Sequence, residues 1–286
     1  MSVSIGEALQ QASEALHAAE VTAARRDSVT LLTHVTGKDR TYLLTHPEQN
    51  ISEAELQDFI ARVKRRSQGE PVQYIVGAQD FFGREFIVTP DVLIPRPETE
   101  ILVEAVLRLK NNLPDEPHIC DVGTGSGCIA ITLLCELEKA HAVALDLSPA
   151  ALGVARENAN RLSVADRISF VVSDCFDSVD PSATVFDVIV SNPPYVAASV
   201  VPVLQREVRD YEPHEALTPG GDGLSIIRRL LADSPRFLVP QGWLTLEIGF
   251  DQGDSVEQLI DPKSWRLVDL LPDLQNIPRI VVLQKR

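Results

Sequence analysis

The chain has 286 residues, 44% of them hydrophobic, and its 41 acidic residues outnumber 26 basic ones, which gives a formal net charge of −15. This length suits one large domain and one small one. The acidic balance argues against DNA as a main partner, because binding to a phosphate backbone depends on lysine and arginine. No apolar stretch is long enough to cross a membrane and no basic-then-apolar leader opens the chain, so we expect a cytoplasmic protein.

Neither the cysteines nor the histidines are spaced as metal ligands usually are. Cys120, Cys128, Cys135 and Cys175 show no CxxC pattern, and the six histidines form no HxxxH or HExxH motif. We therefore expect buried reduced thiols and no metal site.

Residues 1–80 are predicted to form a small helical bundle. Ile5, Leu9, Ala12 and Leu16 recur at helical spacing, and a second such run ends at Gly37. Ser52 and Glu55 form a capping box ahead of a further apolar helix. For the basic residues at positions 62–66 we favour a solvated helix face, with the docking of a partner as the alternative.

Residues 81–97 are predicted to form a hairpin followed by a connector. Aromatic and β-branched residues flank Gly83, and Pro90, Pro95 and Pro97 punctuate the segment that follows. We place the domain boundary here, so that residues 98–286 form the larger domain, which opens with a helix.

From His118 onward, apolar strands alternate with helices. Strands are expected at 119–122, 142–145, 168–172, 185–190, 243–248, 265–271 and 280–284, and helices at 128–137 and 150–161. This alternation predicts an α/β fold with a parallel, doubly wound sheet.

A glycine-rich turn, Gly123-Thr124-Gly125-Ser126-Gly127, follows the first of these strands. Its GxGxG spacing differs from the GxGxxG that binds a dinucleotide pyrophosphate, and no P-loop lysine follows. Asp146 ends the next strand, where a carboxylate can accept hydrogen bonds from a ribose diol, and Asp174 ends the third, where it can meet an adenine amino group. A tight corner between strand and helix would explain the turn alone, but the combination predicts an S-adenosylmethionine site rather than an NAD site.

The fourth strand ends in Asn192-Pro193-Pro194-Tyr195. The prolines force a rigid extended turn at the carboxyl end of the strand, where ligands bind in open α/β sheets. The side-chain oxygen of Asn192 and a neighbouring main-chain carbonyl can accept both hydrogens of an amide or exocyclic amino group, and Tyr195 can stack on that planar group. From these four residues alone, a plain proline-rich turn is an equal alternative.

The sequence resembles the release-factor glutamine N5-methyltransferases, known as the HemK/PrmC family, over nearly its whole length. The segments that carry the resemblance are the helical N-terminal region, residues 71–77, 93–100, 121–127 and 192–195, Tyr211-Glu212-Pro213 and residues 220–224. Asn-Pro-Pro-Tyr is shared with adenine-N6 DNA methyltransferases, whereas the 93–100 and Tyr-Glu-Pro segments are far more specific. The family fold is a Rossmann-like seven-stranded class I methyltransferase sheet with a reversed last strand.

The resemblance implies the substrate, which is the glutamine of the Gly-Gly-Gln loop in class-one peptide release factors, with residues 1–80 as the docking domain. It implies that Asn192, Pro193, Pro194 and Tyr195 hold the glutamine amide, with Asn192, Pro193 and Tyr195 acting in catalysis. The cofactor residues would be Gly123, Thr124, Gly125, Ser126, Gly127, Asp146, Asp174, Cys175 and Asn192. Cys175 departs from the family, in which an aromatic residue is frequent at this position, so stacking on adenine is expected to be lost.

Two further residues have competing interpretations. Thr99 either helps to close the site or caps the following helix, and Glu247 either faces the pocket or pairs with an arginine. Two other functions are alternatives: an adenine-N6 nucleic-acid methyltransferase, which would need a basic groove, and a non-catalytic adaptor with a degenerate methyltransferase domain. We expect a monomer that methylates a protein and binds neither DNA nor membrane.

Overall fold

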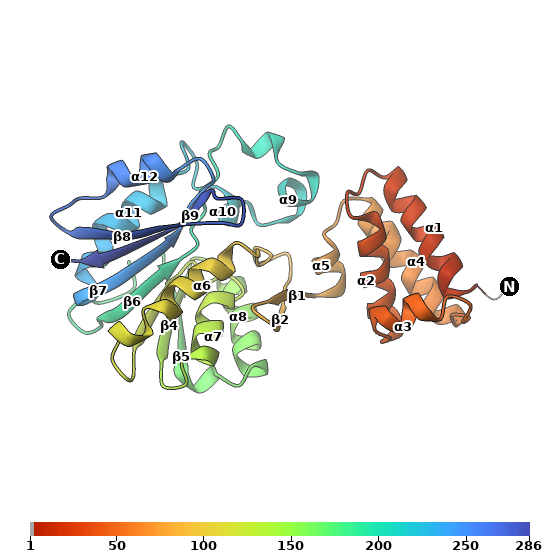
Figure 1. Cartoon of the computed structure of the whole chain (residues 1–286), viewed down its shortest axis with the longest axis horizontal. Coiled ribbons are helices and arrows are strands. Elements are labelled where there is room, and N and C mark those ends of the chain that lie inside the picture. The colour runs from red at the N-terminus through yellow and green to blue at the C-terminus, as the bar shows by residue number, and fades with distance from the viewer. Residues whose placement is uncertain (1–2) are drawn as a thin grey trace. The chain divides into compact units, whose positions relative to one another are not determined.

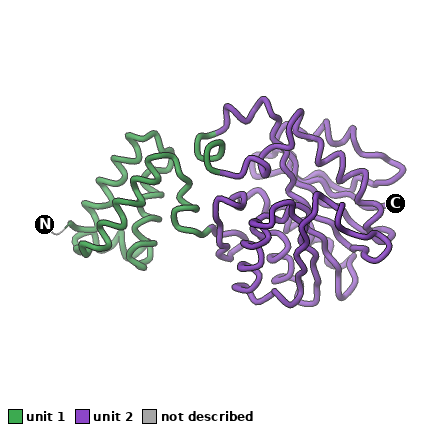
Figure 2. The backbone as a smooth tube through the Cα atoms, turned by 180° about the vertical axis from the view of Figure 1, so that it is seen from behind, with its two compact units in different colours: residues 1–78, 205–211 green, residues 79–204, 212–286 purple. Residues whose placement is uncertain are grey.

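The computed structural model describes residues 3–286, which divide into two compact units (Figure 2). The first unit contains the chain up to Ala78 together with residues 205–211, and the second contains residues 79–204 and 212–286. The predicted boundaries place residues 205–211 in the second domain, but this short segment groups with the N-terminal helices.

The first unit is a helical bundle, as the N-terminal sequence pattern predicted. Its helices are α1 (Ile5–Ala18), α2 (Ala24–Thr36), α3 (Arg40–Thr45), α4 (Glu53–Ser67), α5 (Val72–Val76) and α9 (Arg206–Tyr211). Ser4 with Glu7 and Ser52 with Glu55 form capping boxes that start α1 and α4. Helix α2 ends at Gly37, whose φ of 66° is the left-handed conformation that glycine adopts without strain.

Arg66 explains why residues 205–211 belong to the first unit. Its Nε donates to Oδ2 of Asp27 at 2.8 Å, and its Nη2 lies 2.6 Å from Oε2 of Glu207 in α9. Arg66 and Asp27 are both buried. The hydroxyl of Tyr211 also donates to the carbonyl oxygen of Gln68. A buried arginine therefore binds α9 to α4 and α2.

A hairpin of β1 (Ala78–Phe81) and β2 (Arg84–Ile87) follows, and Gly83 lies in its turn with a φ of 71°. The second unit contains a seven-stranded sheet in the order β5-β4-β3-β6-β7-β9-β8. Its strands are β3 (His118–Val122), β4 (His141–Asp146), β5 (Ile168–Val172), β6 (Phe186–Ser191), β7 (Leu238–Glu247), β8 (Trp265–Pro272) and β9 (Pro278–Lys285). Strand β9 runs antiparallel to both of its neighbours, β7 and β8, whereas β3 to β7 pair in parallel. The predicted α/β fold with a reversed last strand is thus confirmed.

Helices cover both faces of this sheet (Figure 1). Helices α6 (Thr99–Arg108), α7 (Cys128–Glu136) and α8 (Pro149–Arg161) pack on one face, and α11 (Ser225–Asp233) and α12 (Gly253–Leu259) pack on the other. Successive residues of a strand alternate between the two cores: Val188 and Val190 join the first, whereas Ile189 joins the second. The short helix α10 (His214–Leu217) lies in the loop region after β6.

Strand β7 is longer than its sequence pattern indicated. It begins at Leu238 rather than Trp243, and Gln241 within it has a φ of 63°. The pairing register with β6 shifts between Phe186 and Val188. The apolar pattern of the sequence therefore indicates only the regular part of the strand, which follows this irregularity. Within residues 3–286, no helix combines the length and apolarity needed to span a bilayer.

Candidate active site

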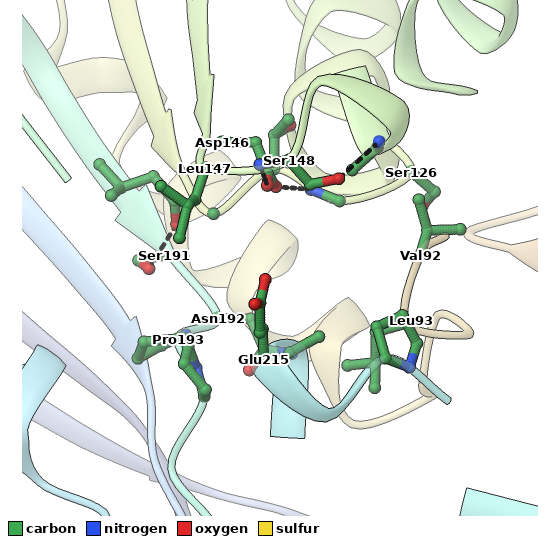
Figure 3. A pocket seen from close by; sticks show the side chains of 18 of the residues that line it. Val92, Leu93, Ser126, Asp146, Leu147, Ser148, Ser191, Asn192, Pro193 and Glu215 are labelled. Carbon is green, nitrogen blue, oxygen red and sulfur yellow. Dashed lines mark hydrogen bonds between the residues drawn. The ribbon is translucent and has the colours of Figure 1, made fainter. Parts of the chain in front are cut away.

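The carboxyl ends of β3, β4, β5 and β6 open into a pocket of about 430 Å³ (Figure 3). The glycine turn, Asp146, Asp174, Asn192 and the connector before α6 all contribute to its wall. This is the edge of an open α/β sheet where ligands bind, and the volume is that of a small-molecule site. The predicted site residues therefore meet at one place, with the exceptions of Gly127 and Tyr195, which do not line the pocket.

The glycine turn presents bare backbone to this pocket. Gly123 and Gly125 have φ values of 75° and 55°, and a Cβ added to either would meet no atom of residues 3–286 within 4 Å. Gly127 differs, because a Cβ there would lie 2.6 Å from Cδ1 of Ile131 and 3.2 Å from Cβ of Ala155. Gly127 thus permits close packing at the start of α7, whereas the other two glycines leave room for a ligand.

Asp146 is oriented by two backbone amides. The N–H of Gly125 donates to Oδ2 at 2.8 Å, and that of Ser148 donates to Oδ1 at 2.9 Å (Figure 3). Burial raises the pKa of this carboxyl, and the two amide hydrogen bonds oppose the rise. A carboxylate oxygen has a second acceptor site, so Asp146 can still receive two hydroxyl groups of a diol.

Asp174 and Cys175 follow β5. Nη1 of Arg229 donates to Oδ1 of Asp174 at 2.7 Å, and Nη2 donates to its carbonyl oxygen at 2.9 Å. Cys175 has a φ of 48°, which is unusual for a residue with a Cβ. Burial raises the pKa of the Cys175 thiol to about 11, so at neutral pH it is a neutral wall residue and not a nucleophile.

Asn192 lies directly after β6. The hydroxyl of the preceding Ser191 donates to the carbonyl oxygen of Val122 at 2.6 Å and so ties β6 to β3. The amide nitrogen Nδ2 of Asn192 donates to Oγ1 of Thr99 at 3.0 Å. This contact leaves the other half of the amide, the oxygen Oδ1, available as an acceptor.

Behind Asn192 lie the buried Thr99 and Glu247 and the partly buried Tyr195. Oγ1 of Thr99 donates to Oε2 of Glu247 at 2.7 Å, and the Tyr195 hydroxyl donates to Oε1 at 3.1 Å. Burial raises the pKa of Glu247, while the bonds from Thr99 and Tyr195 and the charge of Arg279 lower it. Burial and the nearby Glu247 carboxylate raise the pKa of Tyr195.

The expectation that Tyr195 stacks on a substrate amide does not match this geometry. Its side chain packs against the core formed with α11 and α12, and its hydroxyl is bound to Glu247. Pro193 and Pro194 still line the pocket, whereas Tyr195 does not. Thr99 is the first residue of α6 and not its N-cap, which is Glu98.

Comparison with known proteins decides the family. Residues 7–77 match the family described as PrmC N-terminal domain, and residues 98–236 match Methyltransferase small domain. The chain is 42% identical over 285 residues to a release factor glutamine methyltransferase of Koribacter versatilis, with 99% of each chain covered. It is 44% identical to the protein of that name in Cereibacter sphaeroides, with 96% of each covered.

The chain belongs to the family of release factor glutamine methyltransferases. Among solved structures, the catalytic domain of hMettl16 superposes with a TM-score of 0.55 at 17% identity, covering 82% of both chains. A methyltransferase from Pyrococcus furiosus gives a TM-score of 0.51 at 16% identity, covering 79% of this chain and 97% of that one. These two likenesses show the fold.

Several pocket residues of this methyltransferase were not among the predicted site residues. Val92 and Leu93 of the connector, Leu147 and Ser148 after β4, and Glu215 of α10 line the pocket. Figure 3 shows the Glu215 carboxylate directed into the cavity. Leu93 and Glu215 lie within or next to segments that carried the family resemblance, but no spacing rule indicates that such segments reach the same cavity.

Proposed function

We propose that this methyltransferase transfers a methyl group from S-adenosylmethionine to the side-chain amide nitrogen N5 of the glutamine in the Gly-Gly-Gln motif of class-one peptide release factors. The observation that carries the proposal is the Asn192 amide, which lines the pocket with its nitrogen bound to Thr99 and its oxygen left to accept. End-to-end similarity to proteins named release factor glutamine methyltransferase supports the choice of substrate.

The pocket fits S-adenosylmethionine in size and in the kind of groups that it offers. Gly123 and Gly125 expose backbone without a Cβ, Asp146 offers carboxylate oxygens to a ribose diol, and Asp174 and Cys175 would border the adenine. Thr124 and Ser126 complete the turn. When bound, the cofactor supplies a methyl group already activated by a sulfonium, so the protein's task is mainly to position the acceptor.

Positioning falls to Asn192 and Pro193. Oδ1 of Asn192 and the carbonyl oxygen of Pro193 would each accept one hydrogen of the glutamine amide. These bonds orient the nitrogen lone pair and add electron density as positive charge develops on nitrogen. Orientation alone can contribute roughly 7–11 kcal/mol at best. A cationic amide nitrogen loses its proton readily, so no strong general base is required.

The proposal extends to the setting of the reaction. We expect a monomeric cytoplasmic enzyme that acts on a protein and not on DNA or at a membrane. The net charge of −15 supports a protein over a nucleic-acid substrate, because no general excess of positive charge attracts phosphates.

Mass spectrometry of a purified release factor, incubated with this enzyme and S-adenosylmethionine, tests the proposal. We expect the peptide that contains Gly-Gly-Gln to gain one methyl group, located on the glutamine side chain by fragmentation. A release factor carrying alanine in place of that glutamine is the control and should gain none. Methyl transfer to double-stranded DNA, with none to the release factor, would favour the adenine-N6 alternative and contradict the proposal.

A further inference from the structure

We propose that Thr99 and Glu247 are positioning residues that fix which way the Asn192 amide faces. This inference rests on the proposed function for its meaning in catalysis, because that function requires an oxygen acceptor in the pocket. Neither residue is expected to touch the substrate amide, and both would act through Asn192.

The fold brings the three side chains together from separate parts of the chain. Strands β6 and β7 are parallel neighbours in which Ser191 pairs with Leu246, so the next residues along, Asn192 and Glu247, lie side by side at the end of the sheet. Thr99 is the first residue of α6, which packs against β7 and β9. Thr99 and Glu247 are only 2% and 1% exposed, so water does not compete for their hydrogen bonds.

The chemistry of the three groups gives this chain of hydrogen bonds a direction. Each oxygen of Glu247 accepts a hydrogen bond, Oε1 from Tyr195 and Oε2 from Thr99 at 2.7 Å, so the single hydroxyl hydrogen of Thr99 is used on Glu247. The oxygen of Thr99 can then only accept from Asn192, which must present its NH₂ group at 3.0 Å. The amide oxygen is thereby turned away from Thr99. If the Thr99 hydroxyl could donate to Asn192 instead of Glu247, the amide could rotate by 180° and present its NH₂ group to the pocket.

The Tyr195 hydroxyl also binds Glu247, but its hydrogen bond is not one of those that connect Glu247 to Asn192 through Thr99. It binds the other carboxylate oxygen, Oε1, at 3.1 Å, so both oxygens of the buried carboxylate have a donor. A buried carboxylate that keeps its charge needs such partners. Tyr195 therefore supports Glu247, and we expect its contribution to the orientation of Asn192 to be indirect.

Thr245 offers a matched comparison two residues before Glu247 on the same strand. It is fully buried like Thr99, but its Oγ1 has no hydrogen-bond partner in the described part of the chain. Replacing either threonine by valine keeps the shape and removes one buried hydroxyl. Only the Thr99 change removes a hydroxyl that holds Asn192, so the pair separates positioning from a general effect of altering the core.

The activity test uses Thr99→Val, Thr99→Ser and Thr245→Val in the full-length enzyme with a release factor as acceptor. We expect Thr99→Val to lower kcat about 10- to 100-fold, with the calorimetric Kd for S-adenosylmethionine changed less than about threefold. Thr99→Ser should restore most of kcat, and Thr245→Val should leave it unchanged. An unaltered kcat in Thr99→Val, or a serine variant as impaired as the valine variant, would overturn the proposal.

A second measurement does not depend on turnover. In protein labelled with ¹⁵N-asparagine, the side-chain NH₂ signals of Asn192 are assigned by their disappearance in Asn192→Asp. We expect slow hydrogen exchange for the proton bonded to Thr99, at least tenfold faster exchange in Thr99→Val, and no change in Thr245→Val. Equal exchange in all three proteins rejects the inference whatever the substrate is. Failure to methylate a release factor, with this exchange pattern intact, rejects only the proposed function.

Discussion

The Thr124 hydroxyl donates to Oδ2 of Asp121 at 2.7 Å, beneath the glycine turn, whereas Oδ1 of Asp121 has no hydrogen-bond partner among residues 3–286. Asp121 is fully buried at the end of β3, and burial raises the pKa of its carboxyl from 3.8 to about 7. The hydrogen bonds from Thr124 and the Ala130 amide oppose this rise, and the charge of Asp146 adds to it. Thr124 of the glycine turn is therefore held by Asp121, a carboxyl group that is costly to ionise.

The first prediction concerns stability and pH. Because the folded state holds the Asp121 proton more tightly than the unfolded state, this residue's contribution is fully present below about pH 4 and is lost as pH rises to about 7. The free energy of unfolding should fall by up to about 4 kcal/mol across this window, at about 1.4 kcal/mol per pKa unit. Asp121→Asn should lack this component. Urea unfolding of both proteins at several pH values measures it, and a constant difference between them from pH 4 to 8 would contradict it.

The second prediction concerns Asn192. Asn192→Ala removes the oxygen acceptor from the pocket wall, so we expect kcat to fall at least about 100-fold. Cofactor affinity should change little, because the glycine turn and Asp146 remain in place. Turnover with radiolabelled S-adenosylmethionine and calorimetric titration measure the two effects. Wild-type turnover in this variant would remove Asn192 from the mechanism.

The third prediction separates two glycines of one turn. Gly125→Ala places a methyl group toward open space, so it should weaken cofactor binding about tenfold or more, with a loss of stability of only about 1 kcal/mol from its positive φ. Gly127→Ala drives a methyl group against Ile131 and Ala155 and should lower stability by about 2–3 kcal/mol. Thermal unfolding and calorimetry of both variants test this. The prediction fails if Gly125→Ala and Gly127→Ala lower the cofactor affinity and the free energy of unfolding in the same proportion.

The fourth prediction concerns the buried arginine of the helical unit. Asp27→Ala leaves Arg66 short of one partner in the core, so we expect a loss of about 3 kcal/mol in the stability of this unit. Asp58→Ala, which breaks an exposed pair with Arg62 in α4, should cost less than about 1 kcal/mol. Hydrogen exchange of amides in α1, α2 and α4 reads the stability of this unit directly. Equal effects of the two substitutions would show that burial of the pair is unimportant.

Local signals allowed much of the fold to be predicted. The capping boxes at Ser4 and Ser52 and the left-handed Gly37 act within a few residues of themselves, so one window of sequence contains the whole cause. Of these, the sequence pattern predicts the box at Ser52 and the stop at Gly37. The strand ends placed Asp146 and Asn192 at one edge of the sheet because parallel strands share a carboxyl end.

The rest of the site depends on long-range packing. Thr99 lies 93 residues from Asn192 and 148 residues from Glu247, and no periodicity links positions so far apart. The sequence places Tyr195 in the pocket because it belongs to the same four-residue motif as Asn192, but in the structure its side chain packs against the core near α11 and α12. Glu215 lies on a helix of four residues, too short to show a pattern, and only the fold reveals that its carboxylate faces the cavity.

Because residues 205–211 group with the N-terminal helices, no single truncation point in the sequence separates the two units. A fragment that starts at residue 79 would retain Glu207 while losing its arginine, and a fragment that ends at residue 78 would retain Arg66 while losing an acid that neutralises it. Exchange of N-terminal modules between relatives would therefore have to carry a short piece of the downstream sequence with it. In this chain, two separate segments, the residues up to Ala78 and residues 205–211, together encode the helical unit.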